Sequence, residues 1–79
     1  MIMRKYRVTG HFALIGVGII LYLSDEQAVT RRKSLKQKKK NIYLVVEAVQ
    51  FKQDEEIVVV SGELSKAVLM NLQEIKAPK

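Results

Sequence analysis

The chain has 79 residues, no cysteine and one histidine, with 48% hydrophobic residues and a formal net charge of +6. It therefore forms no disulfide, and a lone histidine cannot provide a nitrogen- and sulfur-ligated metal site. A domain this small buries only about 60% of its unfolded surface. We therefore expect one domain, residues 1–79, whose stability benefits from a protein partner or from self-association.

The N-terminal third is predicted to form strands. Residues 6–9 alternate between apolar and polar like a half-buried strand, and the run 12–23 carries no charge. A membrane-spanning helix needs about 20 apolar residues, which disfavours the membrane. A signal peptide fits the length, but small residues are missing at the cleavage positions. We predict instead a hairpin of 12–15 with 19–23, turning at Gly16 and Gly18, with insertion or export as the third interpretation.

Two helices are predicted, each after a serine. Ser24 and Gln27 form a capping-box pattern, which predicts a helix over 25–37 whose last turns are rich in cations. Strands are predicted at 42–46 and 57–60, with the charged turn 53–56 between them. Ser61 is predicted to cap a second helix. Its apolar residues lie on one face: Leu64, Ala67, Val68, Leu72 and Ile75.

An internal repeat links the two halves. Shifting the chain by 37 residues places Tyr6 on Tyr43, Val8 on Val45 and Ser24 on Ser61. The sequence therefore predicts an α+β fold of two β-β-α pseudo-repeats, about 4–37 and 41–76, followed by a frayed tail at 77–79. Both hairpins would form one antiparallel-rich sheet, with both helices on one face.

No catalytic motif is present. His11 has no serine, cysteine or second histidine placed to act with it, and phosphate-loop and dinucleotide patterns are missing. Asp54, Glu55 and Glu56 are interpreted as a solvated turn, because three adjacent acids cannot all converge on one ion. We therefore expect no enzymatic activity, no cofactor, no metal and no small-molecule substrate.

The positive charge is concentrated in residues 31–40. This run contains seven cations and no acid: Arg31, Arg32, Lys33, Lys36, Lys38, Lys39 and Lys40. Such a run binds phosphates or an acidic protein, or keeps an apolar protein soluble. Aromatic residues are not interleaved with the cations, so single-strand recognition lacks its stacking component.

Three segments resemble small, uncharacterised proteins of tailed phages and prophages: residues 6–9, 23–28 and 51–57. In that family a strand, a Phe-Lys-x-Gly-Glu turn and a Leu-Ser-x-x-Gln helix start recur, whereas here Asp54 replaces the turn glycine. The resemblance implies a bacterial or phage-infected cytoplasm and a role in virion assembly, without implying any site residue. We therefore predict a non-enzymatic interaction or assembly module. Nucleic-acid binding through the basic run is the alternative.

Overall fold

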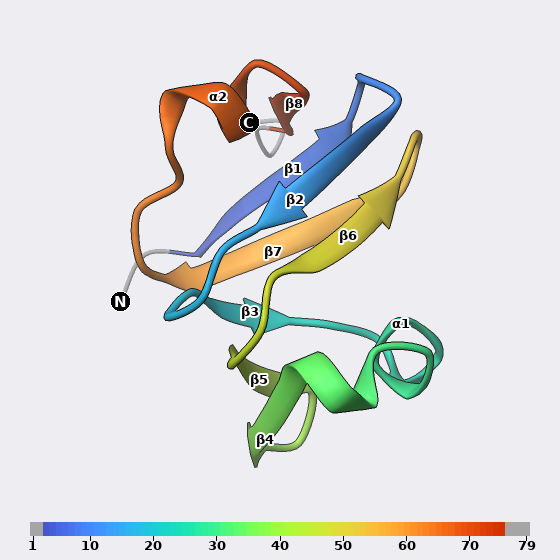
Figure 1. Ribbon diagram of the computed structural model, residues 1–79, viewed down its shortest axis with the longest axis vertical. Coiled ribbons are helices and arrows are strands. Elements are labelled where there is room, and N and C mark those ends of the chain that lie inside the picture. The colour runs from blue at the N-terminus through green and yellow to red at the C-terminus, as the bar shows by residue number, and fades with distance from the viewer. Residues whose placement is uncertain (1–2, 76–79) are drawn as a thin grey trace.

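The computed structural model describes residues 3–75, so the predicted tail at 77–79 lies outside the described residues. Within that range the chain forms eight strands, two short α-helices and one turn of 3-10 helix (Figure 1). In chain order they are β1 Arg4–Val8, β2 Phe12–Ile15, β3 Ile20–Tyr22, α1 Asp25–Val29, η1 Arg32–Ser34, β4 Leu35–Lys39, β5 Ile42–Val45, β6 Val49–Lys52, β7 Glu56–Ser61, α2 Lys66–Leu69 and β8 Leu72–Ile75.

The strands form two antiparallel sheets. Six of them lie side by side in the order β4-β5-β3-β7-β1-β8, and β2 pairs with β6 in a second, two-stranded sheet. In Figure 1 the pair β2–β6 lies across the middle of the larger sheet. The larger sheet has β4 at one edge and β8 at the other.

The hydrophobic core lies between the two sheets. In β2, Ala13 and Ile15 are buried while the residues beside them are exposed, which is the alternation of a strand with one solvated face. Phe51 of β6 is fully buried, and it packs in one cluster with residues of the larger sheet such as Val8 and Leu21. Period-two alternation therefore determines which side chains form the core.

The prediction for the apolar run is partly wrong. Residues 12–15 and 20–22 are strands, but they do not pair with each other. Strand β2 pairs with β6, and β3 pairs with β5 and β7. Gly18, with φ of 97°, lies in the connection that carries the chain from one sheet to the other. Local sequence predicts the strands, but the choice of partner depends on residues that lie 20 to 41 positions away in the chain.

The helix that begins at Ser24 is confirmed at its start and wrong at its end. The Ser24 hydroxyl accepts a hydrogen bond from the backbone N–H of Gln27, and the Gln27 side chain binds the Ser24 backbone N–H. The helix nevertheless ends at Val29. Residues 35–39 form strand β4 instead, because Leu35 pairs with the buried Val45 and joins the sheet.

The second predicted helix is also wrong over most of its length. Ser61 is the last residue of β7, and the N-cap is Ser65, which begins a helix of only four residues. Leu72 and Ile75 lie in strand β8, beside β1. The predicted α+β fold of two β-β-α units under two covering helices is therefore wrong. The described chain is mostly antiparallel sheet.

The unit that occurs twice is β-β-β-α-β. Leu35 of the first copy pairs with Val45, and Leu72 of the second copy pairs with Val8. Leu72 lies 37 residues after Leu35, and Val45 lies 37 residues after Val8, so the two pairs occupy equivalent positions of the repeat. The first strand of each half pairs with strands of the other half, β1 with β7 and β8, and β5 with β3 and β4. The two halves are therefore interlocked, and neither can form its own sheet without the other.

The predicted strands at 42–46 and 57–60 correspond to β5 and β7, and the charged residues at 53–55 form the turn between β6 and β7. The second predicted hairpin is nevertheless wrong, because β5 pairs with β3 and β4 whereas β7 pairs with β1 and β3. Asp54 adopts a positive φ of 72° in the β6–β7 turn, a conformation that aspartate tolerates. None of the helices within residues 3–75 has the length and apolar character needed to cross a membrane.

Gly62 gives a first testable consequence of the fold. Its φ is 102°, and an added Cβ would lie 2.8 Å from Ile19 Cδ1 and 3.3 Å from Ile19 Cα. Gly62→Ala should therefore lower the free energy of unfolding by about 1–2 kcal/mol, measured by urea denaturation. The control is Gly16→Ala, where an added Cβ meets nothing within 4 Å. That change should cost less than about 0.5 kcal/mol, and similar losses at both glycines would contradict this account.

Candidate functional site

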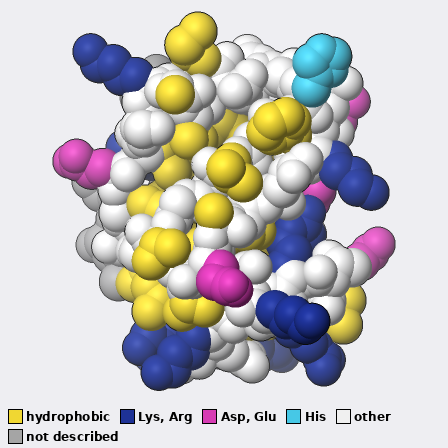
Figure 2. Space-filling view, viewed as in Figure 1, with side chains coloured by type: hydrophobic (Ala, Val, Ile, Leu, Met, Phe, Trp, Pro, Cys, Tyr) yellow, Lys and Arg dark blue, Asp and Glu magenta, His cyan; other side chains and the backbone are white. Residues whose placement is uncertain are grey.

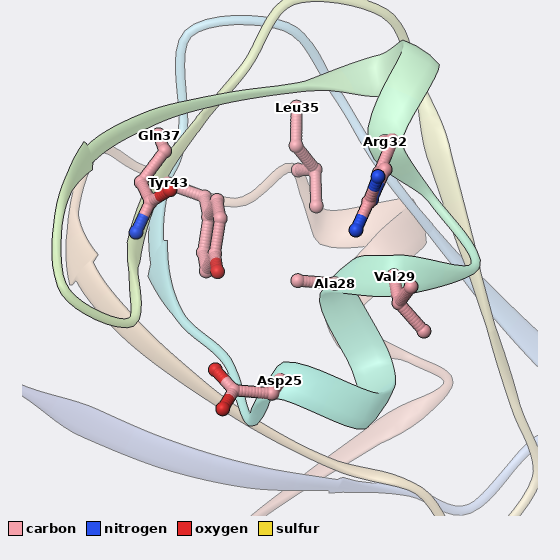
Figure 3. A pocket seen from close by; sticks show the side chains of 7 residues that line it. All are labelled: Asp25, Ala28, Val29, Arg32, Leu35, Gln37 and Tyr43. Carbon is pink, nitrogen blue, oxygen red and sulfur yellow. The ribbon is translucent and has the colours of Figure 1, made fainter.

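A groove of about 360 Å³ lies between α1, η1, β4 and β5, at one end of the large sheet (Figure 3). The residues that line it are Asp25, Ala28, Val29, Arg32, Leu35, Gln37 and Tyr43. Ala28 and Leu35 make its floor apolar, while Asp25, Arg32 and Tyr43 lie around it from three directions in Figure 3. The groove therefore offers apolar contact, one cation and one carboxylate to whatever enters it.

The register of the sheet explains why these side chains meet. Tyr43 pairs with Gln37 on one side and with the buried Leu21 on the other, so these three side chains share the core face of the sheet. Helix α1 is too short to cover that face as far as the edge strand. The uncovered part of the core face becomes the groove.

Asp25 is held in place at the groove. The Asn41 side-chain amide donates to the Leu23 carbonyl at 2.8 Å and to Asp25 Oδ1 at 3.2 Å. Asn41 occupies the left-handed region with φ of 64°, in the turn between β4 and β5, where asparagine is well tolerated. The β4–β5 turn is thereby tied to the start of α1.

The lysines of β4 lie mainly on the opposite face from the groove. Leu35 and Gln37 face the groove, whereas Lys36 pairs with Leu44 and Lys39 pairs with Ile42 on the other face. Lys38 is the extra residue of a β-bulge, where the register shifts. Strand β4 therefore separates an apolar groove from a row of positive charge.

Strand β4 also presents backbone groups to solvent. The Ser34 carbonyl accepts from the Val46 N–H, which makes 34 and 36 the positions that bond to β5. Because hydrogen-bonding alternates along an antiparallel strand, the backbone groups of Leu35 and Gln37 point to the free edge. The Leu35 N–H donates a hydrogen bond to the Arg32 carbonyl within the chain. The Leu35 carbonyl and both backbone groups of Gln37 remain at an edge that no described strand covers.

Arg31 does not belong to the accessible part of the basic run. Its guanidinium donates to Glu55 Oε1 at 2.8 Å and to the backbone carbonyls of Gln27 and Gln50 at 2.8 and 3.0 Å. It also lies 4.3 Å from the centre of the Phe51 ring. Only 14% of its side chain is exposed. The prediction that Arg31 contacts a partner is not supported by this position, because its donors are used inside the protein.

Glu55 is the acid that holds Arg31. Partial burial raises the pKa of Glu55, but hydrogen bonds from the Lys52 N–H and the Gln27 side chain, together with the Arg31 charge, outweigh this effect. The pKa of Glu55 therefore lies below its ordinary value, and the carboxylate is ionised at neutral pH. The acidic turn is thus more than a solvated loop, since Glu55 connects α1 to the β6–β7 turn.

The neighbouring acid Glu56 has other partners. Its carboxylate binds Arg7 at 3.0 Å and Lys5 at 3.1 Å, and these two donors lower the pKa of Glu56. Asp54, Glu55 and Glu56 therefore do not converge on one point. His11 is exposed on a bend before β2. The described structure places it on no common site with these acids.

Six cations of the basic run remain exposed, and they lie on η1, on β4 and in its turn. They are Arg32, Lys33, Lys36, Lys38, Lys39 and Lys40. In Figure 2, Lys and Arg side chains gather at the lower end of the molecule, where Figure 1 places β4 and β5. This end of the protein, which we call the basic edge, combines the six cations with the groove and the free strand edge.

A second exposed surface is apolar. On the outer side of the two-stranded sheet, Phe12 and Leu14 are each 47% exposed, and Val17 of the following turn is 67% exposed. Yellow side chains accordingly spread over the middle of Figure 2. Small monomers expose single apolar side chains routinely. The surface is compatible with the predicted self-association, which stays a prediction.

Sequence reasoning found the lysines of the basic edge but missed the groove beside them. Asp25 and Tyr43 are 18 residues apart, and only the pairing of β3, β4 and β5 brings them together. Comparisons with protein-family models, curated proteins and solved structures found no match to this chain. The resemblance to small phage proteins therefore stays a prediction.

Proposed function

We propose that the protein is a non-enzymatic interaction module that binds an acidic segment of a partner protein at the basic edge. The observation that carries this proposal is that six exposed cations share one end of the protein with a groove whose floor is apolar: Arg32 lines the groove, and the lysines of β4 lie mainly on the other face of the same strand. Opposite charge on a partner would speed its association and favour it over basic competitors. The apolar floor would add contact area that charge alone does not provide.

The chemistry of the groove supports binding rather than catalysis. Its only carboxylate, that of Asp25, accepts a hydrogen bond from Asn41, and its tyrosine lies on the core face of the sheet. Within residues 3–75 the groove brings together no nucleophile and base of the kind that covalent catalysis requires. The properties that the groove and its surroundings offer are positive charge and apolar surface, and both serve binding.

Nucleic acid is the alternative partner, and three observations make it second. Arg31 is withdrawn into the protein by Glu55, the Asp25 carboxylate lies in the groove, and β4 turns its lysines away from Tyr43. A phosphate backbone would be repelled by Asp25, and a base stacked on Tyr43 would lie on the face opposite Lys36. An acidic peptide, which carries both charge and apolar side chains, fits both faces.

The biological setting that we propose comes from the sequence resemblance. Small phage and prophage proteins with similar segments suggest a bacterial or phage-infected cytoplasm and a role in virion assembly. An acidic segment of another assembly protein would then be the partner. Self-association through the apolar side of β2 is compatible with the same role.

The test compares two double variants that change net charge equally. Lys36→Gln/Lys39→Gln removes charge from the basic edge, and Lys52→Gln/Lys66→Gln removes it from exposed positions elsewhere. We expect a fluorescent glutamate-rich peptide to bind the unmodified protein at about 50 mM salt and to bind more weakly at about 200 mM. The basic-edge variant should weaken binding about tenfold, and the control variant less than about threefold, measured by fluorescence anisotropy.

The same titration with a DNA duplex distinguishes the two partners. With Arg31 withdrawn, at most six cations contact phosphates, so the log–log salt slope would be about −5 at its steepest. Duplex binding with that salt dependence and without peptide binding would replace the proposal by the nucleic-acid alternative. No binding of either probe at the lower salt would leave the lysines a role in solubility.

A further inference from the structure

We propose that the acidic partner binds as an added β-strand along the free edge of β4. This inference rests on the proposed function and specifies the conformation of the partner. The observation behind it is a juxtaposition within one strand. The same two residues, Leu35 and Gln37, line the groove with their side chains and direct backbone groups to the free edge.

The backbone supplies the first part of the recognition. The Gln37 N–H, the Gln37 carbonyl and the Leu35 carbonyl face away from β5, which is the arrangement that an incoming strand requires. Peptides that extend a sheet gain affinity from such main-chain hydrogen bonds, and specificity from pockets for alternate side chains. The described residues leave this edge uncovered.

The side chains supply the second part. In a strand added to β4, residues opposite Leu35 and Gln37 would lie on the groove side of the sheet, the side that Tyr43 and Ala28 also line. Residues opposite Lys36 would lie on the lysine side. The ligand class that matches is therefore an extended peptide in which apolar and acidic residues alternate. A peptide with the same residues in separate blocks cannot satisfy both sides in one register.

The charge of β4 argues against a second copy of this chain as the added strand. Pairing β4 with β4 of another molecule would set three lysines against three lysines, and like charges directly opposite each other destabilise a sheet. Lysines on an edge strand are a known means of preventing edge-to-edge association. The lysines of β4 therefore disfavour pairing with another lysine-rich strand, whereas a strand with acidic residues can still pair with β4.

The experiment uses two synthetic peptides of identical composition. In one, glutamate and valine alternate, and in the other all glutamates precede all valines. The full-length protein should bind the alternating peptide at least about tenfold more tightly. Gln37→Pro removes the outward N–H from the edge, a position where proline is tolerated, and should weaken binding of the alternating peptide at least about tenfold. Gln37→Thr also shortens the groove-lining side chain but keeps the N–H, so it should weaken binding much less than Gln37→Pro, and the difference between the two variants measures the contribution of the N–H.

A second measurement keeps the proposal testable if Gln37→Pro fails to fold. Alternating peptides are N-methylated at every second residue, in either of the two phases, and bound to the unmodified protein. An added strand bonds through only one phase, so one methylated peptide should lose binding and the other should retain it. Equal effects of both phases would overturn the proposal.

The outcomes separate this inference from the proposed function. Equal binding of the alternating and block peptides, unaffected by Gln37→Pro, would overturn strand addition while leaving electrostatic binding of an acidic partner intact. Failure of both peptides to bind would overturn the proposed function as well. A concentration-dependent dimer that Gln37→Pro abolishes, seen by sedimentation, would assign the edge to a second copy instead.

Discussion

Phe51→Ala is expected to remove a large share of the stability of this protein. Phe51 is fully buried, pairs with Ala13 across the small sheet, and lies under the Arg31 guanidinium. Truncating a buried phenylalanine costs about 3–5 kcal/mol. A chain of this length is stable by only about 4–12 kcal/mol in total. The midpoint of urea unfolding, followed by circular dichroism, should fall steeply or the variant should be unfolded without denaturant.

Phe12→Ala is the matched control for this result. Phe12 pairs with Lys52 in the same two-stranded sheet, one position from the Ala13–Phe51 pair, but its side chain is 47% exposed. Its truncation should cost less than about 1 kcal/mol, because much of its surface is already in water. Equal losses at the two positions would mean that the core does not lie between the sheets as described.

The first helix shows how far the sequence could predict this fold. The capping box at Ser24 is a local signal, and the helix begins there because Gln27 completes it within one turn. The end of the helix is not a local property. Leu35 is the single apolar residue of 35–39, so this segment shows no strand periodicity and is equally compatible with a helix whose cations follow its dipole. Pairing of Leu35 with Val45 decides for the strand.

The second serine failed as a signal for a different reason. Ser61 is followed by Gly62, whose φ of 102° turns the chain out of β7 and lies outside the helical region. The helix can begin only after this turn, and Ser65 provides the cap. A serine before a glycine is therefore a weaker helix signal than Ser24, which has both an acid and a capping glutamine behind it.

The candidate site was predictable only in its charge. Of the seven cations that the sequence places in the basic run, six are exposed in the structure. These could be predicted because an exposed cation needs no particular partner within the protein. Arg31 belongs to the same run in the sequence, but its side chain is only 14% exposed and its donors are bonded within the protein. Its partner Glu55 lies 24 residues away, and only the turn after β6 brings the two together. Charge density is visible in a sequence, whereas ion pairing and grooves depend on strand order.

Glu55→Gln is expected to destabilise the protein at neutral pH and to do so less in acid. The substitution replaces a carboxylate that accepts hydrogen bonds from Arg31, Gln27 and the Lys52 N–H, and leaves the Arg31 charge largely enclosed without its counterion. Hydrogen bonds to charged groups contribute about 1.5–3 kcal/mol. We expect a loss of that size near pH 7, measured by urea denaturation.

The pH dependence follows from the lowered pKa of Glu55. A carboxyl whose pKa is lower in the folded than in the unfolded state stabilises the fold above its unfolded value, about 4.3, and this contribution is lost as the pH falls through the folded value. The difference between Glu55→Gln and the unmodified protein should therefore shrink as the pH falls below about 5.

Glu63→Gln is the control for both measurements. Glu63 is exposed, and the described structure gives its side chain no ion pair or hydrogen bond, so this change should have little effect at either pH. Both glutamines remove one negative charge, so a general effect of net charge would appear equally in the two variants. If the loss caused by Glu55→Gln stays constant from pH 7 into acid, its origin is the shape of the side chain. A loss that falls with pH shows that the charge of Glu55 holds Arg31, and with it α1, against the β6–β7 turn.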